Sequence, residues 1–254
     1  MSSRESGSRV DARTHPPGPG LADVVETYWS TRWDLRGQEP HRFEMLVDPC
    51  VTIAFEAGAS RVVGVSTRLF RRELADAGLI RAVRLRAGAV RAVLPVASAR
   101  GLTDRVVPLG ELVEGPAIEA AVLGAADDEA AFARLDAWLA ARVGRPLPDG
   151  VEAALRALAA IAADPGVTTV RAAAAAAGWS ERALQRLFRD EVGMSPKQAI
   201  RRARLQEAAA RLERGEPTSL AVLARALGYS DQAHLTRDFR AATGRTPAAF
   251  RRTV

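Results

Sequence analysis

The sequence predicts an α+β chain of two domains: a small β-barrel or sandwich with helices, followed by an all-helical domain. Its 254 residues are long enough to form two cores. Short β-type segments separated by turns fill the first part, whereas alanine-rich helical patterns fill the second. A proline- and glycine-rich stretch, GRPLPDG at 144–150, separates the two parts and predicts a linker.

The first 20 residues are rich in Ser, Gly, Pro and charge, which predicts a disordered lead over 1–20. They lack the apolar core of a signal peptide. No apolar run approaches the roughly 20 residues of a membrane helix. The only cysteine, Cys50, excludes an internal disulfide and suits a reducing compartment. We therefore expect a cytoplasmic protein.

A β domain is predicted over 21–113. Close spacing of short strands is typical of a mostly antiparallel sandwich or barrel. The β-type segments, broken by turn residues, span 22–30, 42–47, 50–56, 61–66 and 67–74.

A helical pair and the linker are predicted over 114–148. Ile118 and Val122 recur at helical spacing, and Leu135 and Leu139 do so in a second run. Because this second helix is amphipathic and carries Trp138 and Leu139, we expect 137–143 and the preceding turn to contribute to a homodimer contact.

The segment 149–254 reads as nearly all helix and contains a repeat. GWSERALQRLFRDEVGMSP at 178–196 returns in diverged form as GYSDQAHLTRDFRAATGRTP at 228–247. In each copy a glycine ends a short helix, and a serine, Ser180 or Ser230, opens the next one. This order predicts two helix-turn-helix motifs.

The second helix of each motif, at about 180–191 and 231–242, carries an apolar face and a polar face. Arginine can bond both acceptors of guanine in the major groove, and glutamine can pair with adenine. Gln185 with Arg186, and Gln232 with Arg237, therefore have the chemistry for reading bases. The candidate phosphate contacts are Ser180, Arg189, Ser230, His234 and Arg240.

The net charge of residues 151–254 and the length of the helix between the two copies both agree with a DNA partner. Residues 151–254 hold 17 basic against 10 acidic residues, whereas residues 1–150 hold 19 against 20. The positive field thus belongs to the half with the repeat, which indicates a polyanion. A helix between the copies spans roughly 27 Å, which suits two reading helices about one DNA turn, or 34 Å, apart.

Residues 151–254 resemble the DNA-binding domain of the AraC/XylS family of bacterial transcription regulators. The motifs that carry the resemblance are Arg204-Leu205-x-x-Ala208, Ala224-x-x-x-Gly228-Tyr229, Ser230-Asp231-Gln232, Leu235-x-x-x-Phe239-Arg240 and Gly244-x-Thr246-Pro247.

The resemblance implies a sequence-specific regulator that binds double-stranded DNA and, if it is an activator, contacts RNA polymerase. Ala233 departs from the pattern because it can touch only a thymine methyl, so readout by the second helix is expected to be looser. By resemblance, the base-reading residues are Arg182, Gln185, Arg186, Gln232, Ala233, Thr236 and Arg237.

The front half resembles an uncharacterised, cupin-like domain found before AraC-type modules in actinobacterial regulators. The resemblance lies in YWSTRWDLRG at 28–37, the strand pair around Asp48-Pro49-Cys50, LRAGAVRAVL at 85–94 and LTDRVVPL at 102–109. It implies a small β-barrel that senses something, without implying which effector.

Few residues of the front half suggest a ligand site. Aromatic side chains give large apolar contact, so Trp29, Trp33 and Phe43 are candidates to line a small-molecule cavity. Only two histidines occur there, so we expect neither a metal nor another cofactor. No catalytic pattern is found. The alternative function is a cupin-like enzyme, small-molecule-modifying or alkyl-transferring through Cys50, that the helix-turn-helix repeat localises to DNA. A buried structural role is favoured for Cys50.

Overall fold

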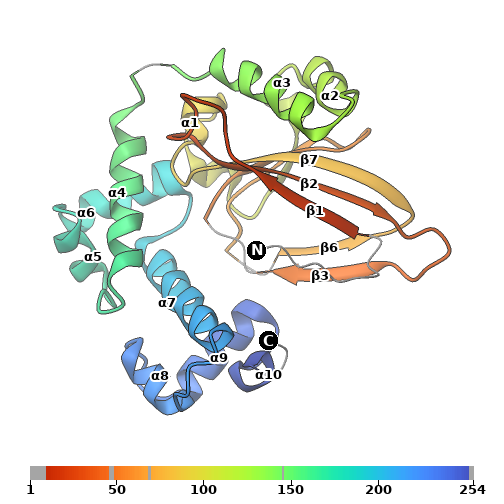
Figure 1. Cartoon of the computed structure of the whole chain (residues 1–254). Helices are drawn as coiled ribbons and strands as arrows, with labels where there is room; N and C mark the ends of the chain where they lie inside the picture. Colours follow the sequence, from red (N-terminus) through yellow and green to blue (C-terminus); the bar gives the residue numbers. More distant parts are fainter. Residues whose placement is uncertain (1–9, 46–48, 68–69, 145, 252–254) are drawn as a thin grey trace.

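The computed structural model describes residues 10–45, 49–67, 70–144 and 146–251. An N-terminal part of strands and short helices leads through a helical pair into an all-helical C-terminal part (Figure 1). The expected antiparallel sheet, its accompanying helices and the helical second part are all present.

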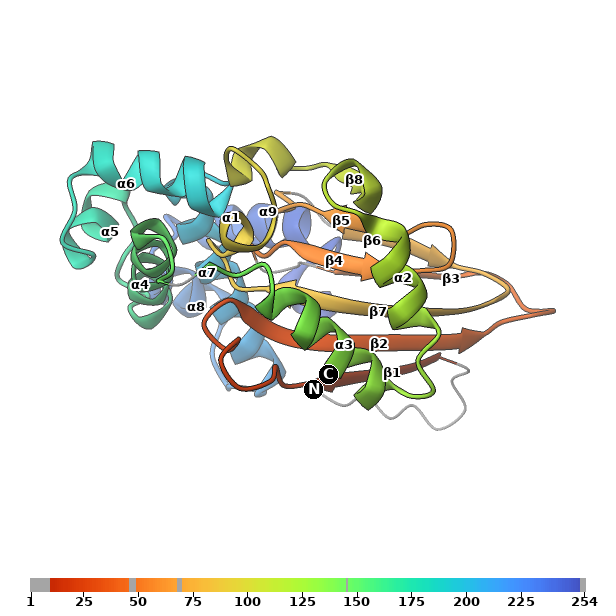
Figure 2. The same cartoon turned by 90° about the horizontal axis from the view of Figure 1, so that it is seen from above.

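The N-terminal part has three layers. Its centre is a six-stranded antiparallel sheet in the order β1-β2-β7-β4-β5-β8. The helices α2 and α3 cover one face, and the two-stranded sheet β3-β6 faces the other (Figures 1 and 2). The strands are β1 (Val10–His15), β2 (Val25–Asp34), β3 (His41–Met45), β4 (Thr52–Phe55), β5 (Arg61–Val63), β6 (Phe70–Leu74), β7 (Ala77–Leu85) and β8 (Val106–Pro108).

Most of the longer helices begin directly after a capping Ser, Thr or Asp residue. Three short turns of other helix types join them: the 3-10 helices η1 (Ala99–Leu102) and η2 (Leu109–Glu111) and the π-helical turn η3 (Phe188–Val192). The α-helices are α1 (Val90–Val93), α2 (Gly115–Leu123), α3 (Asp128–Ala140), α4 (Asp149–Ala163), α5 (Val170–Ala176), α6 (Glu181–Leu187), α7 (Pro196–Glu213), α8 (Leu220–Ala226), α9 (Gln232–Thr243) and α10 (Pro247–Arg251).

Strand β1 corrects the expectation of a disordered lead, which holds for none of the residues from Val10 to His15. They pair antiparallel with β2, from Val10 opposite Trp33 to His15 opposite Tyr28. Just after the strand, the backbone amide of Gly18 donates to Asp136 on α3 at 3.1 Å. The polar composition of this segment predicts no core, but an unpaired edge of β2 can bind any extended backbone.

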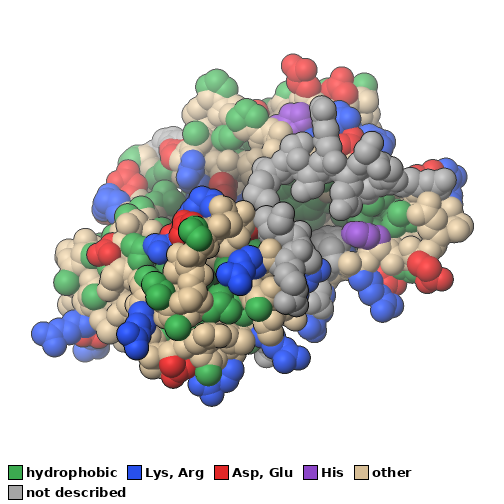
Figure 3. All heavy atoms as spheres, turned by 60° about the horizontal axis from the view of Figure 1, so that its bottom comes forward, with side chains coloured by type: hydrophobic (Ala, Val, Ile, Leu, Met, Phe, Trp, Pro, Cys, Tyr) green, Lys and Arg blue, Asp and Glu red, His purple; other side chains and the backbone are tan. Residues whose placement is uncertain are grey.

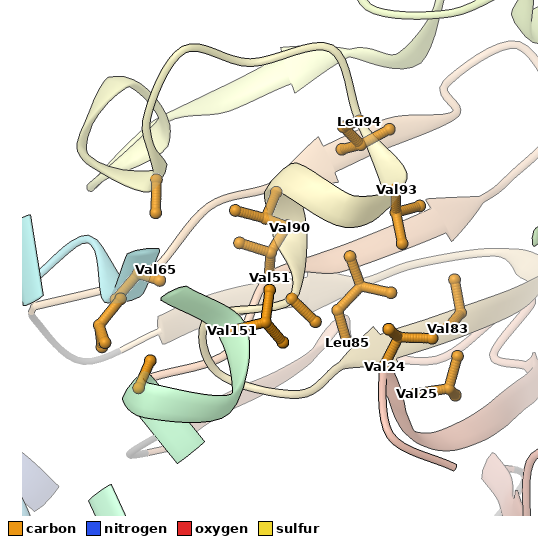
Figure 4. Close-up of a cluster of buried hydrophobic side chains, with 14 of the residues drawn as sticks. Val24, Val25, Val51, Val65, Val83, Leu85, Val90, Val93, Leu94 and Val151 are labelled. Carbon is orange, nitrogen blue, oxygen red and sulfur yellow. The ribbon is translucent and has the colours of Figure 1, made fainter. Parts of the chain in front are cut away.

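One apolar core runs through the N-terminal part and into the first helical unit. Val151, at the start of α4, lies against Val51 and Val90 (Figure 4). The same cluster contains Leu184 and Phe188 from the first motif. A separate cluster holds the second motif together, and its buried members are Leu205, Ala208, Leu212, Leu223, Ala224, Leu227, Tyr229, Leu235 and Phe239.

The structure removes Leu139 from the expected dimer contact at the end of α3, and the contact itself stays a prediction. Leu139 is fully buried. Its neighbour Trp138 packs edge-on against Phe55, with ring centroids 6.5 Å apart, and lies under the guanidinium of Arg142. These side chains are used inside the fold, so Leu139 offers no surface to a second copy.

Candidate nucleic-acid interface

The first motif consists of α5 and α6. Gly178 takes a left-handed conformation with φ 72° between them, as a tight exit from a helix requires. Ser180 caps α6, because its hydroxyl accepts from the amide of Ala183 at 3.2 Å. Leu184 is buried, whereas Arg182, Gln185 and Arg186 are exposed. The apolar stripe thus anchors the helix and leaves the predicted base-reading residues facing solvent.

The second motif, α8 and α9, repeats the arrangement with one correction. Its cap is Asp231 and not Ser230: the Asp231 carboxylate accepts from the amide of His234 at 2.7 Å. That bond, followed by one from the Ser230 hydroxyl, lowers the pKa of the Asp231 carboxyl. Ser230 instead supports the cap. Of the four predicted base-reading residues here, Thr236 is half-buried and the rest are exposed: Gln232, Ala233 and Arg237.

The candidate phosphate contacts differ in their surroundings. Ser180, Ser230 and Arg240 are exposed. Arg189 is also exposed, but it forms two hydrogen bonds, of 2.8 and 3.2 Å, with Asp190. The half-exposed His234 packs edge-on against Tyr229, with ring centroids 5.1 Å apart. Arg189 therefore has to share its guanidinium between Asp190 and a phosphate.

Helix α7 fixes the second motif to the first. Arg201 makes two hydrogen bonds, both of 3.0 Å, to Asp238 on α9. Arg204 lies over the Tyr229 ring at 3.8 Å from its centroid and donates to the Leu227 carbonyl. Burial raises the pKa of Tyr229 to about 12. These contacts set the direction in which α9 presents its exposed side chains.

The Arg201–Asp238 pair could not be predicted from the sequence. The two residues lie 37 positions apart, and each alone looks like a solvated charge on a helix. From the sequence, Arg204 is identifiable only as part of a motif. Its position over Tyr229 supplies the physical reason for that motif, because a guanidinium stacked on an aromatic ring locks two elements together.

The N-terminal part holds the first motif directly. Segment η1 lies beside η3 (Figure 2), where the Thr103 hydroxyl donates to the Gly193 carbonyl. Arg91 forms an ion pair with Glu191, which is buried. Arg202 on α7 donates to the Ser66 carbonyl at 2.9 Å. The first reading helix is thus attached to the β domain as well as to its own motif.

The surface of the helical part carries more basic than acidic side chains (Figure 3). Figure 3, seen from the side of α8 to α10, shows Lys and Arg side chains spread over it with fewer acidic side chains between them. A single groove of about 1000 Å³ brings together all the predicted contact residues of the first motif, which are Ser180, Arg182, Gln185, Arg186 and Arg189.

A second hollow, of about 780 Å³, lies in the β domain between its two sheets. Trp29 lines it, as the sequence predicts. Trp33 does not: it is buried in an apolar cluster, and its indole N–H donates to the Ala75 carbonyl at 2.9 Å. The side chain of Phe43 lies outside the described residues.

Cys50 is half-buried, which corrects the expectation of a buried structural cysteine. It lines the same cavity, and its thiol donates to Glu26 at 3.2 Å. His15 and His41 line the cavity too. Among the residues that the structure describes, no three His, Cys, Asp or Glu side chains come together to hold a metal ion. No helix in the described ranges has the length and apolar character to cross a membrane.

Comparison with known families identifies the helical part. Residues 173–253 match a family model described as a helix-turn-helix domain. This part of the chain is a helix-turn-helix domain. DNA binding and transcription regulation are the functions that such a domain indicates. Residues 13–108 match a second family, described as a domain of unknown function (DUF6597), which does not address the expected cupin-like character.

Several solved structures are similar to the chain. A transcriptional regulator with an AraC-type DNA-binding domain from Chromobacterium violaceum is 24% identical over 40% of this chain and 91% of that one, with a TM-score of 0.38. A probable AraC family transcriptional regulator from Rhodopseudomonas palustris is 29% identical over 40% and 96%, with a TM-score of 0.36. ToxT from Vibrio cholerae is 9% identical over 96% and 98%, with a TM-score of 0.42. No curated protein matches the chain.

Proposed function

We propose that this protein is a sequence-specific, DNA-binding transcription regulator of the AraC/XylS type, in which α6 and α9 read successive major grooves. The observation that carries the proposal is the pair of capped helices that expose Arg and Gln side chains while their apolar sides are buried. Arg186 and Arg237 are exposed, so their guanidinium groups can reach guanine. RNA polymerase is a further partner if the protein activates transcription.

The rigid connection between the motifs supports a paired reading mode. Helix α7 has 18 residues and therefore spans about 27 Å. Its start is closed by a capping box between Ser195 and Gln198. Arg201 and Arg204, in the first half of α7, hold the second motif through Asp238 and Tyr229, which supports one common frame for the two reading helices. A fixed frame of this length suits two consecutive grooves on one face of DNA.

The experiment is a selection of bound duplexes from random-sequence DNA by the full-length chain. Relative to the wild type, the single variants Arg186→Ala and Arg237→Ala are each expected to lose about 1–3 kcal/mol of binding to the selected sites and to tolerate changes at the bases they read. Arg156→Ala is the matched control, because Arg156 is exposed on α4, outside both motifs, and pairs with Glu152 at 3.2 Å. If a variant carrying both Arg186→Ala and Arg237→Ala bound with unchanged affinity and selectivity, the assignment of the reading helices would fail.

The cavity of the β domain supports regulation by a small molecule. Its volume of about 780 Å³ falls in the range of ligand sites, and its walls combine apolar side chains such as Ile80 with polar ones such as Thr31. The β domain and the first motif share one core, which includes Val51 and Phe188. The apolar walls of the cavity, such as Ala54 and Ile80, belong to a separate cluster. Because β4 and β7 contribute side chains to both clusters, the route of modulation that we include in the proposal runs through the sheet to α6.

A further inference from the structure

The groove beside α6 is built by both parts of the chain. One wall is the exposed face of α6, including Arg182 and Arg186, and the floor is the turn into α7 around Ser195. The opposite wall, which we call the η1 wall, comes from the β domain and consists of Thr67, Arg100, Thr103 and Asp104. Its volume is about 1000 Å³, and η1, which carries Arg100, runs beside the end of the reading helix in Figure 2.

The shape of DNA decides what lies next to a reading helix. A major groove is about 12 Å wide and admits one α-helix, so a phosphate backbone flanks that helix on each side. When α6 enters a major groove, one of the two backbones has to pass between α6 and the η1 wall. A hollow there is required if the β domain is not to collide with DNA.

The chemistry of the η1 wall suits a phosphate. Arg100 is exposed and no carboxylate among the described residues pairs with it. Thr67 and Thr103 also line the groove, but their hydroxyls donate to Asp104 and to the Gly193 carbonyl, so Arg100 is the donor that this wall offers a phosphate. The lining contains one carboxylate, Asp104, whose two oxygens accept from the amide and the hydroxyl of Thr67 at 2.7 and 2.6 Å.

The wall is held in place relative to the reading helix. Thr103 donates to the Gly193 carbonyl at the end of η3, and Arg91 pairs with the buried Glu191. A side chain added at Gly193 would lie 3.0 Å from the Ala99 carbonyl, so the backbones of η1 and η3 are in close contact there. A residue on η1 therefore keeps its place when α6 docks on DNA.

We propose that the β domain is part of the DNA interface: the backbone that borders the first reading helix lies in this groove, and Arg100 donates to one of its phosphates. The inference rests on the proposed function, because it needs α6 in a major groove. It adds a contact from outside the helix-turn-helix domain, which extends the footprint beyond the first half-site without adding sequence information.

The test measures the affinity of the full-length chain for a duplex selected from random DNA and for a random-sequence duplex of equal length, across a series of salt concentrations. Arg100→Ala is expected to weaken both complexes to a similar extent, by about threefold or more, and to reduce the slope of log K against log salt by about one. In ethylation interference, the set of phosphates whose modification blocks binding is expected to be smaller by one for Arg100→Ala, beside the first half-site. Arg32→Ala is the matched control: Arg32 is an exposed arginine of the β domain outside the groove, and its variant is expected to bind as the wild type does.

The outcomes separate the two proposals. Unchanged salt slope and interference pattern in Arg100→Ala, with Arg186→Ala still relaxing selectivity, would overturn the groove contact and leave the regulator intact. Tighter binding by Arg100→Ala would also overturn it, because the η1 wall would then hinder DNA. No selective binding by the wild type would instead refute the proposed function itself. Since Arg100 is exposed, folding of the variant is expected to be normal and is checked by circular dichroism.

Discussion

At the scale of single residues, Arg81 carries a charge into the interior of the β domain. Only 1% of its surface is exposed. Its guanidinium donates to Asp128 at 2.9 Å and to the carbonyls of Val122 and Ala125 at 2.8 and 3.2 Å. Ser30 completes the group by donating to Asp128 at 2.6 Å. A buried charge is tolerated only with such partners, so this cluster ties the sheet to α3.

The pKa of Asp128 leads to a stability prediction. Burial raises it, but the hydrogen bonds from Ser30 and Arg81 together outweigh burial, so the pKa lies below its ordinary value. A carboxyl with a lowered pKa stabilises the fold above about pH 4, and the gain is lost as pH falls through the folded-state pKa. Asp128→Asn is therefore expected to cost about 1–3 kcal/mol at pH 7, because Arg81 loses its counter-charge.

Chemical denaturation at pH 7 and at pH 3 checks this prediction, and the difference between wild type and Asp128→Asn is expected to shrink at the lower pH. Asp127→Asn is the control. Asp127 caps α3 by accepting from the Ala130 amide at 2.8 Å, and asparagine caps a helix equally well. A control as unstable as Asp128→Asn would mean that the loss comes from the helix start and not from Arg81.

At the scale of elements, the two faces of β2 have different roles. Consecutive side chains of a strand point to opposite faces. Thr31 lines the cavity, whereas Arg32 is exposed on the other side. A large side chain at position 31 is thus expected to fill part of the cavity, and the same side chain at position 32 is not.

Binding of the fluorescent organic anion 8-anilinonaphthalene-1-sulfonate tests the cavity as a ligand site. Thr31→Trp is expected to weaken dye binding by about tenfold, because the indole occupies the space that the dye needs. Arg32→Trp is expected to bind the dye as the wild type does. Equal binding by all three proteins would show that small apolar molecules do not enter between the sheets.

At the scale of the whole molecule, the two helix-turn-helix motifs differ in what supports them. Phe188 and Phe239 are equivalent residues of the repeat, and both are fully buried. Phe188 belongs to the core that continues into the β domain, whereas Phe239 belongs to the small separate cluster. The second motif is therefore expected to open independently of the rest of the chain.

Hydrogen exchange followed by mass spectrometry checks this division. Phe239→Ala is expected to cost about 3–5 kcal/mol locally and to speed exchange in 205–251 alone. Phe188→Ala, with a similar loss of buried surface, is expected to speed exchange in the β domain as well as in the first motif. Faster exchange of the β domain in Phe239→Ala would contradict the existence of two separate cores.

The repeated motifs could be predicted from the amino-acid sequence because their signals are local. Gly178 and Gly228 end helices, caps open the next ones, and apolar residues recur at helical spacing, all within about 20 residues. Even here the sequence does not distinguish Ser230 from Asp231 as the cap of the second motif, since both residue types cap helices, and the structure shows Asp231 in that place.

Contacts between distant residues required the three-dimensional structure. Strand β1 exists because β2 offers an edge, and Trp33 is core and not cavity wall because of its partner at Ala75. Arg100 gains a role only where η1 meets η3. Local preferences specify a helix or a turn, but which segments meet depends on burial and hydrogen bonding summed over the folded chain, and no short stretch of sequence carries that information.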